Sequence, residues 1–97
     1  MTIIKSSETN KVHASPTTAI WEFPMEEKAI SGAVTEINGR YPEKGLAVNK
    51  KSKELAFVLS GEGNVVSPTL NRPIKVGDII FLDKGESFAW EGNLTLF

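Results

Sequence analysis

The sequence contains no cysteine and a single histidine, His13. Without cysteine the chain can form neither a disulfide nor a thiolate metal site, which fits a reducing compartment. No apolar run approaches the roughly 20 residues that a bilayer-spanning helix needs, and the N-terminal segment lacks the unbroken apolar core of a signal peptide. We therefore expect a cytoplasmic protein with no membrane segment.

A surplus of charge of either sign is also missing. The formal net charge is -1, from 11 basic and 12 acidic side chains. No overall field draws such a chain to nucleic acid or to an anionic membrane, so we expect neither as a partner. Lys50, Lys51 and Lys53 form a short basic run, which we interpret as a solvated loop. In a sharper alternative, one of these lysines holds an anionic ligand.

The chain does contain a hydrophobic alternation of period two. Leu55, Phe57 and Leu59 point to one face of a strand over residues 54–60, and the residues between them point to the other face. Both sets are largely apolar, which predicts a strand that is covered on both faces. Other strands are expected at residues 18–23, 33–37, 65–66 and 79–82. The whole chain, residues 1–97, has room for one core and is expected to form one domain.

Clusters of glycine, proline and asparagine separate these runs. We expect turns at residues 38–39, 42–45 and 61–64. Helix is limited to short turns at residues 6–9 and 25–30. Many short strands separated by turns predict an all-β sandwich or barrel with little helix.

Two glycine-bounded segments carry a more specific signal. In the first, Glu54 is followed after six residues by Gly61. In the second, a strand after Gly77 ends before Gly85, and Asp83 stands two residues before that glycine. Phe88 and Trp90 follow at a spacing of two.

In this order, the two segments resemble the two signature motifs of the cupin superfamily, over residues 45–92. The resemblance implies a cupin-type double-stranded β-helix, which is a small antiparallel β-barrel or jelly roll, with residues 1–17 as an N-terminal arm. The chain also looks like an uncharacterised bacterial group of small single-domain cupins. Members of that group continue beyond the last strand, so the presence of a short tail after Phe97 stays open.

The typical cupin metal site is missing from these motifs. The family's histidine positions fall on Ala47 and Asn49 in the first motif and on Phe88 in the second. A loop shorter by one residue would place the first pair on Val48 and Lys50 instead. We favour Ala47 and Asn49, because the apolar Val48 then turns to the other face. Glu54 is left as the one metal-binding side chain, so we expect no metal and no cofactor.

The same alignment gives the candidate site. We expect five residues to line one cavity and bind a ligand there: Ala47, Asn49, Glu54, Phe88 and Trp90. Glu54 is interpreted either as a partly buried carboxylate held by a lysine, backbone amides or water, or as a general acid or base. The aromatic residues Trp21, Tyr41, Phe57, Phe88 and Trp90 either stack against a ligand or fill the barrel. His13 is expected at the surface or at a strand edge.

Three functions follow from these observations. The main hypothesis is a metal-free cupin-like domain that binds a small molecule or a partner. The first alternative is a metal-independent isomerase or epimerase that acts on a small polar or sugar-like substrate through Glu54. The second is a structural dimer with a packed barrel, which a cavity filled by Phe88 would favour. Whether the chain is an enzyme, and which ligand it takes, stays open.

We also expect a homodimer. A small barrel has sheet edges and apolar faces to cover, and the strand at residues 54–60 supplies one such face. Twofold pairing is the commonest assembly of soluble homo-oligomers. The cupins that this chain resembles commonly pair through their N-terminal strands.

Overall fold

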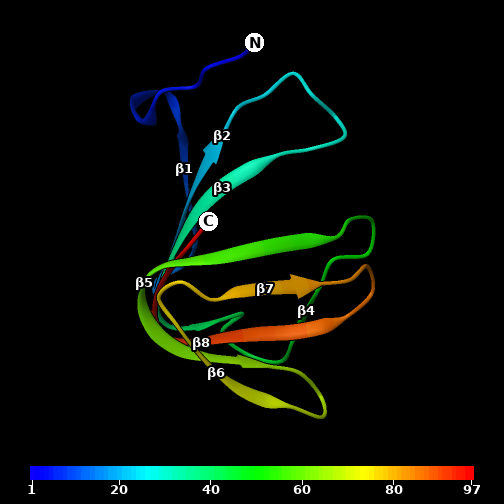
Figure 1. Cartoon of the computed structure of the whole chain (residues 1–97). Coiled ribbons are helices and arrows are strands. Elements are labelled where there is room, and N and C mark those ends of the chain that lie inside the picture. The colour runs from blue at the N-terminus through cyan, green and yellow to red at the C-terminus, as the bar shows by residue number, and fades with distance from the viewer.

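The computed structural model describes all 97 residues, and nearly all of the regular structure is antiparallel strand. The elements are η1 (Ser6–Glu8, a 3-10 turn), β1 (Asn10–Ser15), β2 (Thr18–Phe23), β3 (Gly32–Tyr41), β4 (Ala47–Val48), β5 (Glu54–Val66), β6 (Asn71–Lys75), β7 (Ile79–Leu82) and β8 (Ser87–Leu96). Figure 1 shows these strands wrapped into a small barrel. The predicted all-β barrel with little helix is confirmed.

Two long strands hold the barrel together. The larger sheet has the order β1-β2-β3-β8-β5-β6, while β4 pairs with the start of β8 and β7 pairs with the start of β5. β5 and β8 therefore each run through a bend that joins the larger sheet to a shorter strand pair, and Figure 1 shows β5 curving around the barrel. These bends bring residues 47–54 and 82–90 to the same end of the structure.

The hydrophobic core lies inside this barrel and follows the predicted alternation. In β5, Ala56 and Val58 are buried, whereas Leu55, Phe57 and Leu59 are 65, 40 and 45% exposed. The expectation that this strand is covered on both faces is wrong for the single chain, because no element lies outside β5 and β7. The core consists of Ile37, Ala56, Val58, Ile74, Leu82, Phe88, Trp90, Leu94 and Leu96.

Two of the expected turns are bends inside long strands. Residues 38–39 lie within β3, and residues 61–64 lie within β5. Gly39, Gly92 and Gly63 stand side by side in neighbouring strands at this bend. The glycines are required by close backbone approach rather than by chain reversal: a Cβ on Gly61 would lie 1.9 Å from the carbonyl oxygen of Asn93. The chain reverses later, where the Ser67 N–H donates to the Leu70 carbonyl over 2.8 Å.

Replacing Gly61 by alanine tests this explanation. Gly61 has φ +84°, and Gly77 has φ +92° with no atom within 4 Å of its Cβ position. Gly77→Ala should cost about 1–2 kcal/mol through its backbone conformation alone, and Gly61→Ala should lose about 1–3 kcal/mol more through overpacking. Urea denaturation of the two variants measures the difference. Equal losses would show that the strands do not approach as closely at the bend as the structure has them.

Of the other expected turns and helical turns, two are present and one is absent. Residues 42–45 connect β3 to β4, as predicted, and the turn at Ser6–Glu8 falls within the predicted residues 6–9. Residues 25–30 contain no helix. All of them are exposed, and a short helix without a packed face is unstable in water.

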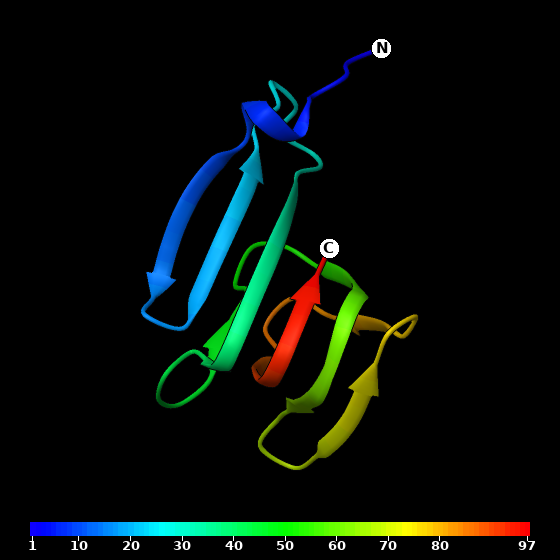
Figure 2. The same ribbon diagram turned by 90° about the vertical axis from the view of Figure 1, so that its left-hand side faces the viewer.

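The N-terminal strands project beyond the barrel. Figures 1 and 2 show η1 and the β2–β3 loop at the far end of an arm formed by β1, β2 and the start of β3. The chain measures 40 by 25 by 25 Å as a result. None of its helices is long and apolar enough to cross a membrane.

Candidate functional site

The first pair of candidate residues meets across two strands. β4 pairs with β8 so that Ala47 lies opposite Phe88. Ala47 packs against the core, while Val48 is 40% exposed. The structure therefore turns Ala47 inward and Val48 outward, as the favoured alignment of the first motif requires.

Glu54 and Asn49 form a second pair beside it. The Asn49 side-chain Nδ2 donates a hydrogen bond to Glu54 Oε1 over 3.0 Å, and both residues are half-buried. The Gly85 N–H donates to the Asn49 carbonyl over 2.9 Å and so holds the loop. Glu54 is thus a partly buried carboxylate, but it is held by an amide side chain rather than by a lysine. The neighbouring Lys53 lies 4.0 Å from Asp83, and both side chains are exposed.

Phe88 and Trp90 fill the barrel interior between these residues and the rest of the core. They are only 4 and 3% exposed. Their ring centroids are 5.9 Å apart at an interplanar angle of 65°, an edge-to-face contact that aromatic pairs favour. The structure places both rings in the core rather than along an open cavity.

These residues do not fit the metal that the cupin fold usually holds. Ala47 and Phe88 carry no donor atom, and the Asn49 amide is bonded to Glu54. No group of three or more His, Cys, Asp or Glu side chains lies close enough together to hold a metal. One carboxylate is a poor ligand set for a transition metal, which binds best to imidazoles, thiolates or several carboxylates.

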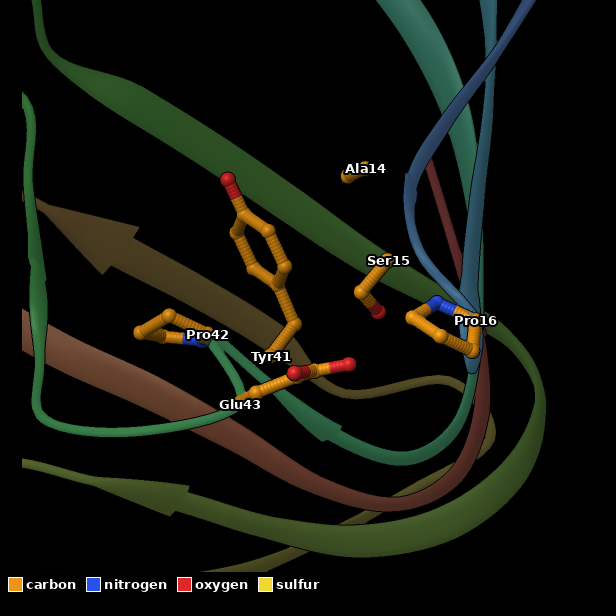
Figure 3. Close-up of a pocket in the computed structure, with 6 residues that line it drawn as sticks. All are labelled: Ala14, Ser15, Pro16, Tyr41, Pro42 and Glu43. Atoms are coloured by element: carbon orange, nitrogen blue, oxygen red, sulfur yellow. The ribbon is translucent and has the colours of Figure 1, made fainter.

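A surface cavity lies away from these residues, between the β1–β2 turn and the loop after β3. It has a volume of about 290 Å³ and is lined by Ala14, Ser15, Pro16, Tyr41, Pro42 and Glu43. Figure 3 shows the Tyr41 ring standing between Pro42 and Glu43 at its base and the hairpin residues Ser15 and Pro16. The sequence analysis named Tyr41 as an aromatic residue and Pro42 and Glu43 as part of a turn, and it assigned none of the six residues to a site.

Arg40 holds the loop that forms one wall of this cavity. Its Nε lies 3.1 Å from a carboxylate oxygen of Glu91, and its guanidinium also donates to the Pro42 carbonyl over 2.7 Å. The Tyr41–Pro42 peptide bond is cis. The cavity lining includes two hydroxyl residues, Ser15 and Tyr41, and the carboxylate residue Glu43. The Ser15 hydroxyl also accepts a hydrogen bond from the Thr17 N–H over 3.2 Å.

His13 and a second hollow lie outside both the surroundings of Glu54 and the cavity beside Tyr41. His13 is exposed on the edge strand β1, as expected. A second, larger hollow of about 630 Å³ lies over β5 and β6, lined by Glu62, Gly63, Asn64, Pro73, Ile74, Lys75 and Asp78. Asp78 accepts a hydrogen bond from the Lys75 N–H over 2.9 Å, which is a turn contact.

Solved structures with the same fold identify the superfamily. A predicted oxalate decarboxylase from Thermotoga maritima is 25% identical, with a TM-score of 0.79, and the match covers 98% of this chain and 94% of that one. The chain is a cupin-superfamily domain. The predicted cupin-type fold and the resemblance that implied it are confirmed.

More distant cupins match this domain over almost its whole length. The nucleoside dehydratase Pac13 from Streptomyces, with uridine bound, has a TM-score of 0.87 at 11% identity, over 99% of this chain and 77% of that one. Ectoine synthase from P. lautus has a TM-score of 0.82 at 17% identity, over 99% and 74%. Neither a protein-family profile nor a curated protein sequence matches the chain. These neighbours have different activities, so they establish the fold and no particular reaction.

Proposed function

We propose that this cupin domain is metal-free and acts by binding a small molecule or a partner rather than by catalysis. The observation that carries the proposal is the packing of Phe88 and Trp90 in the core. These rings occupy the barrel interior beside the family's metal-ligand positions, where a metal and its substrate would need space. The packed interior leaves the outer surfaces of the domain for binding.

The cavity beside Tyr41 is the place where a small molecule would bind. Its two hydroxyls and one carboxylate suit a small polar ligand with hydrogen-bond donors or a positive charge. The carboxylate of Glu43 is exposed and has no hydrogen-bond partner among the side chains. Its charge is therefore free to meet a ligand.

The native protein should carry no stoichiometric iron, manganese, nickel, copper or zinc when it is purified without added metal. Elemental analysis of the purified chain measures this, and melting curves with each metal added provide the control. A metal that bound only the folded state would raise the melting temperature, and we expect no rise. One equivalent of any of these metals in the native protein would overturn the metal-free assignment.

The alternative is a metal-independent isomerase or epimerase that works through Glu54. In its favour, this carboxylate is half-buried and sits where the family carries a metal ligand. An isomerase base removes a C–H proton, so in D₂O it would exchange a substrate proton for deuterium. Proton NMR of sugars, sugar phosphates and uridine incubated with the protein detects this exchange. We expect none, and exchange that Glu54→Gln abolishes would favour the enzyme over the binding domain.

A further inference from the structure

The cavity beside Tyr41 has a lining that offers many hydrogen-bond acceptors and few donors. Two of its six residues, Pro16 and Pro42, have no backbone N–H. The Glu43 carboxylate can only accept hydrogen bonds when it is ionised. No lysine, arginine or histidine is among the lining residues. A ligand that supplies donors therefore suits this cavity better than a ligand that supplies acceptors.

The Ser15 hydroxyl adds a further acceptor to the lining. Its oxygen lies 3.3 Å from the Thr17 hydroxyl oxygen, and the Thr17 hydroxyl itself donates to the Arg40 carbonyl over 3.5 Å. Because the Thr17 proton is used there, Ser15 is the donor in the contact between the two hydroxyls. The Ser15 oxygen also accepts from the Thr17 N–H over 3.2 Å. A hydroxyl oxygen has two lone pairs, so one of them remains to accept a hydrogen bond from a ligand.

Glu43 gives the cavity its charge. Its side chain is exposed and takes part in neither of the two ion pairs of the structure. The guanidinium of Arg40 is bonded instead to Glu91 and to the Pro42 carbonyl. The lining therefore carries one negative charge that no cationic side chain of the protein neutralises.

The remaining walls of the cavity are apolar. Ala14 and the two prolines present aliphatic surface, and the Tyr41 ring stands between the loop after β3 and the β1–β2 hairpin (Figure 3). In the same view the Ser15 hydroxyl and the Glu43 carboxylate project into the space beside this ring. The acceptors thus lie next to hydrocarbon, which suits a ligand with one charged end and an apolar body.

We propose that this cavity binds the primary ammonium group of a small amine with an apolar body. An ammonium group has three N–H donors, which meet the Glu43 carboxylate and the Ser15 oxygen while the hydrocarbon lies against the Tyr41 ring. The cavity volume of about 290 Å³ is at the small end of the roughly 300–1,000 Å³ that ligand sites have. The body is therefore a short alkyl chain or a single ring. This inference rests on the proposed function and names the chemistry of its ligand.

An NMR titration of the ¹⁵N-labelled protein tests the proposal, because the backbone amides of Ala14, Ser15, Tyr41 and Glu43 report on the cavity. Benzylamine, a cation at neutral pH, should shift these signals until they saturate. Benzyl alcohol has the same ring without the charge, benzoate has the opposite charge, and benzyltrimethylammonium has the charge without an N–H. Each of these three should bind at least about fivefold more weakly, the effect of losing one exposed ion pair or one hydrogen bond.

Glu43→Gln should weaken the binding of benzylamine by a similar factor. Glu27→Gln is the matched control, since it removes the same charge from the exposed β2–β3 loop at the far end of the arm. It should leave the binding unchanged. The spectra of the two variants show whether each is folded, and the comparison of the four compounds on the native protein needs no variant.

The possible failures separate this inference from the proposed function. Binding at the cavity that is equally strong for the alcohol, the carboxylate or the quaternary cation would overturn the ammonium assignment and leave a small-molecule site. An equal loss in both glutamine variants would overturn it as well, because the effect would then come from the overall charge. If none of the four compounds shifts the cavity amides, the small-molecule site of the proposed function fails together with this inference.

Discussion

Replacing Phe88 by alanine should remove about 3–5 kcal/mol of folding stability, the usual cost of deleting a buried aromatic ring. Phe88 is 4% exposed and packs edge-to-face on Trp90. The loss follows if the ring is part of a closed core, because the hole left behind exposes neighbouring side chains to empty space rather than to water. A ring that merely lined an open, hydrated cavity would leave no such hole.

Phe23→Ala is the matched control for this substitution. Phe23 is half-buried at the end of β2, on the projecting arm and outside the core. Losing this ring should cost about 1–2 kcal/mol, because only part of its apolar surface leaves water on folding. Urea denaturation of both variants gives the two free energies. If Phe88→Ala cost no more than Phe23→Ala, the barrel would not be closed by Phe88, and the packed-interior basis of the proposed function would fail.

The sequence predicted the strands best where the hydrophobic pattern alone determines them. Residues 18–23 and 79–82 form β2 and β7 with the expected bounds, and the alternation over residues 54–60 assigns the inward side chains correctly. These segments are read from local periodicity. The local signal therefore marks where these strands lie without showing which strands pair with them.

The glycine segments could not be read in the same way. A Gly-Glu-Gly-Asn sequence has the composition of a tight turn, yet residues 61–64 continue β5 because Gly61 and Gly63 lie against the backbone of β8. Turn formation and close strand packing both require a residue without a Cβ. Only the tertiary arrangement separates the two explanations.

The candidate site shows the same limit. The spacing of the first motif correctly predicted that Ala47 points inward and Val48 outward, because strand residues alternate between faces. The partner of Glu54 could not be chosen, because Asn49 reaches it only through the shape of the loop between β4 and β5. The cavity beside Tyr41 was missed because β1 and the loop after β3 are brought together by long-range pairing.

Rebuilding the missing ligands should convert this domain into a metal-binding one. Replacing Ala47, Asn49 and Phe88 together by histidine would add three imidazoles beside Glu54. Ala47 and Phe88 face each other across β4 and β8, and Asn49 is already within hydrogen-bonding distance of Glu54. Three imidazoles and one carboxylate suit a divalent transition metal. The variant should be less stable than the native protein without metal, because it loses the Phe88 ring from the core.

Metal should restore part of that stability, because it binds the folded site and not the unfolded chain. At a metal concentration 100 times the dissociation constant, the gain is about 2.7 kcal/mol, which raises the melting temperature by at least about 10 °C in a domain of this size. The control variant replaces Val48, Asn49 and Phe88 by histidine and keeps Ala47. Val48 points outward and is 40% exposed, so this variant has one imidazole outside the barrel and should show no comparable rise. Elemental analysis and melting curves with zinc, manganese and nickel distinguish the two. An equal response of both variants, or a folded Ala47 variant without any response, would show that Ala47, Asn49 and Phe88 do not surround one point beside Glu54.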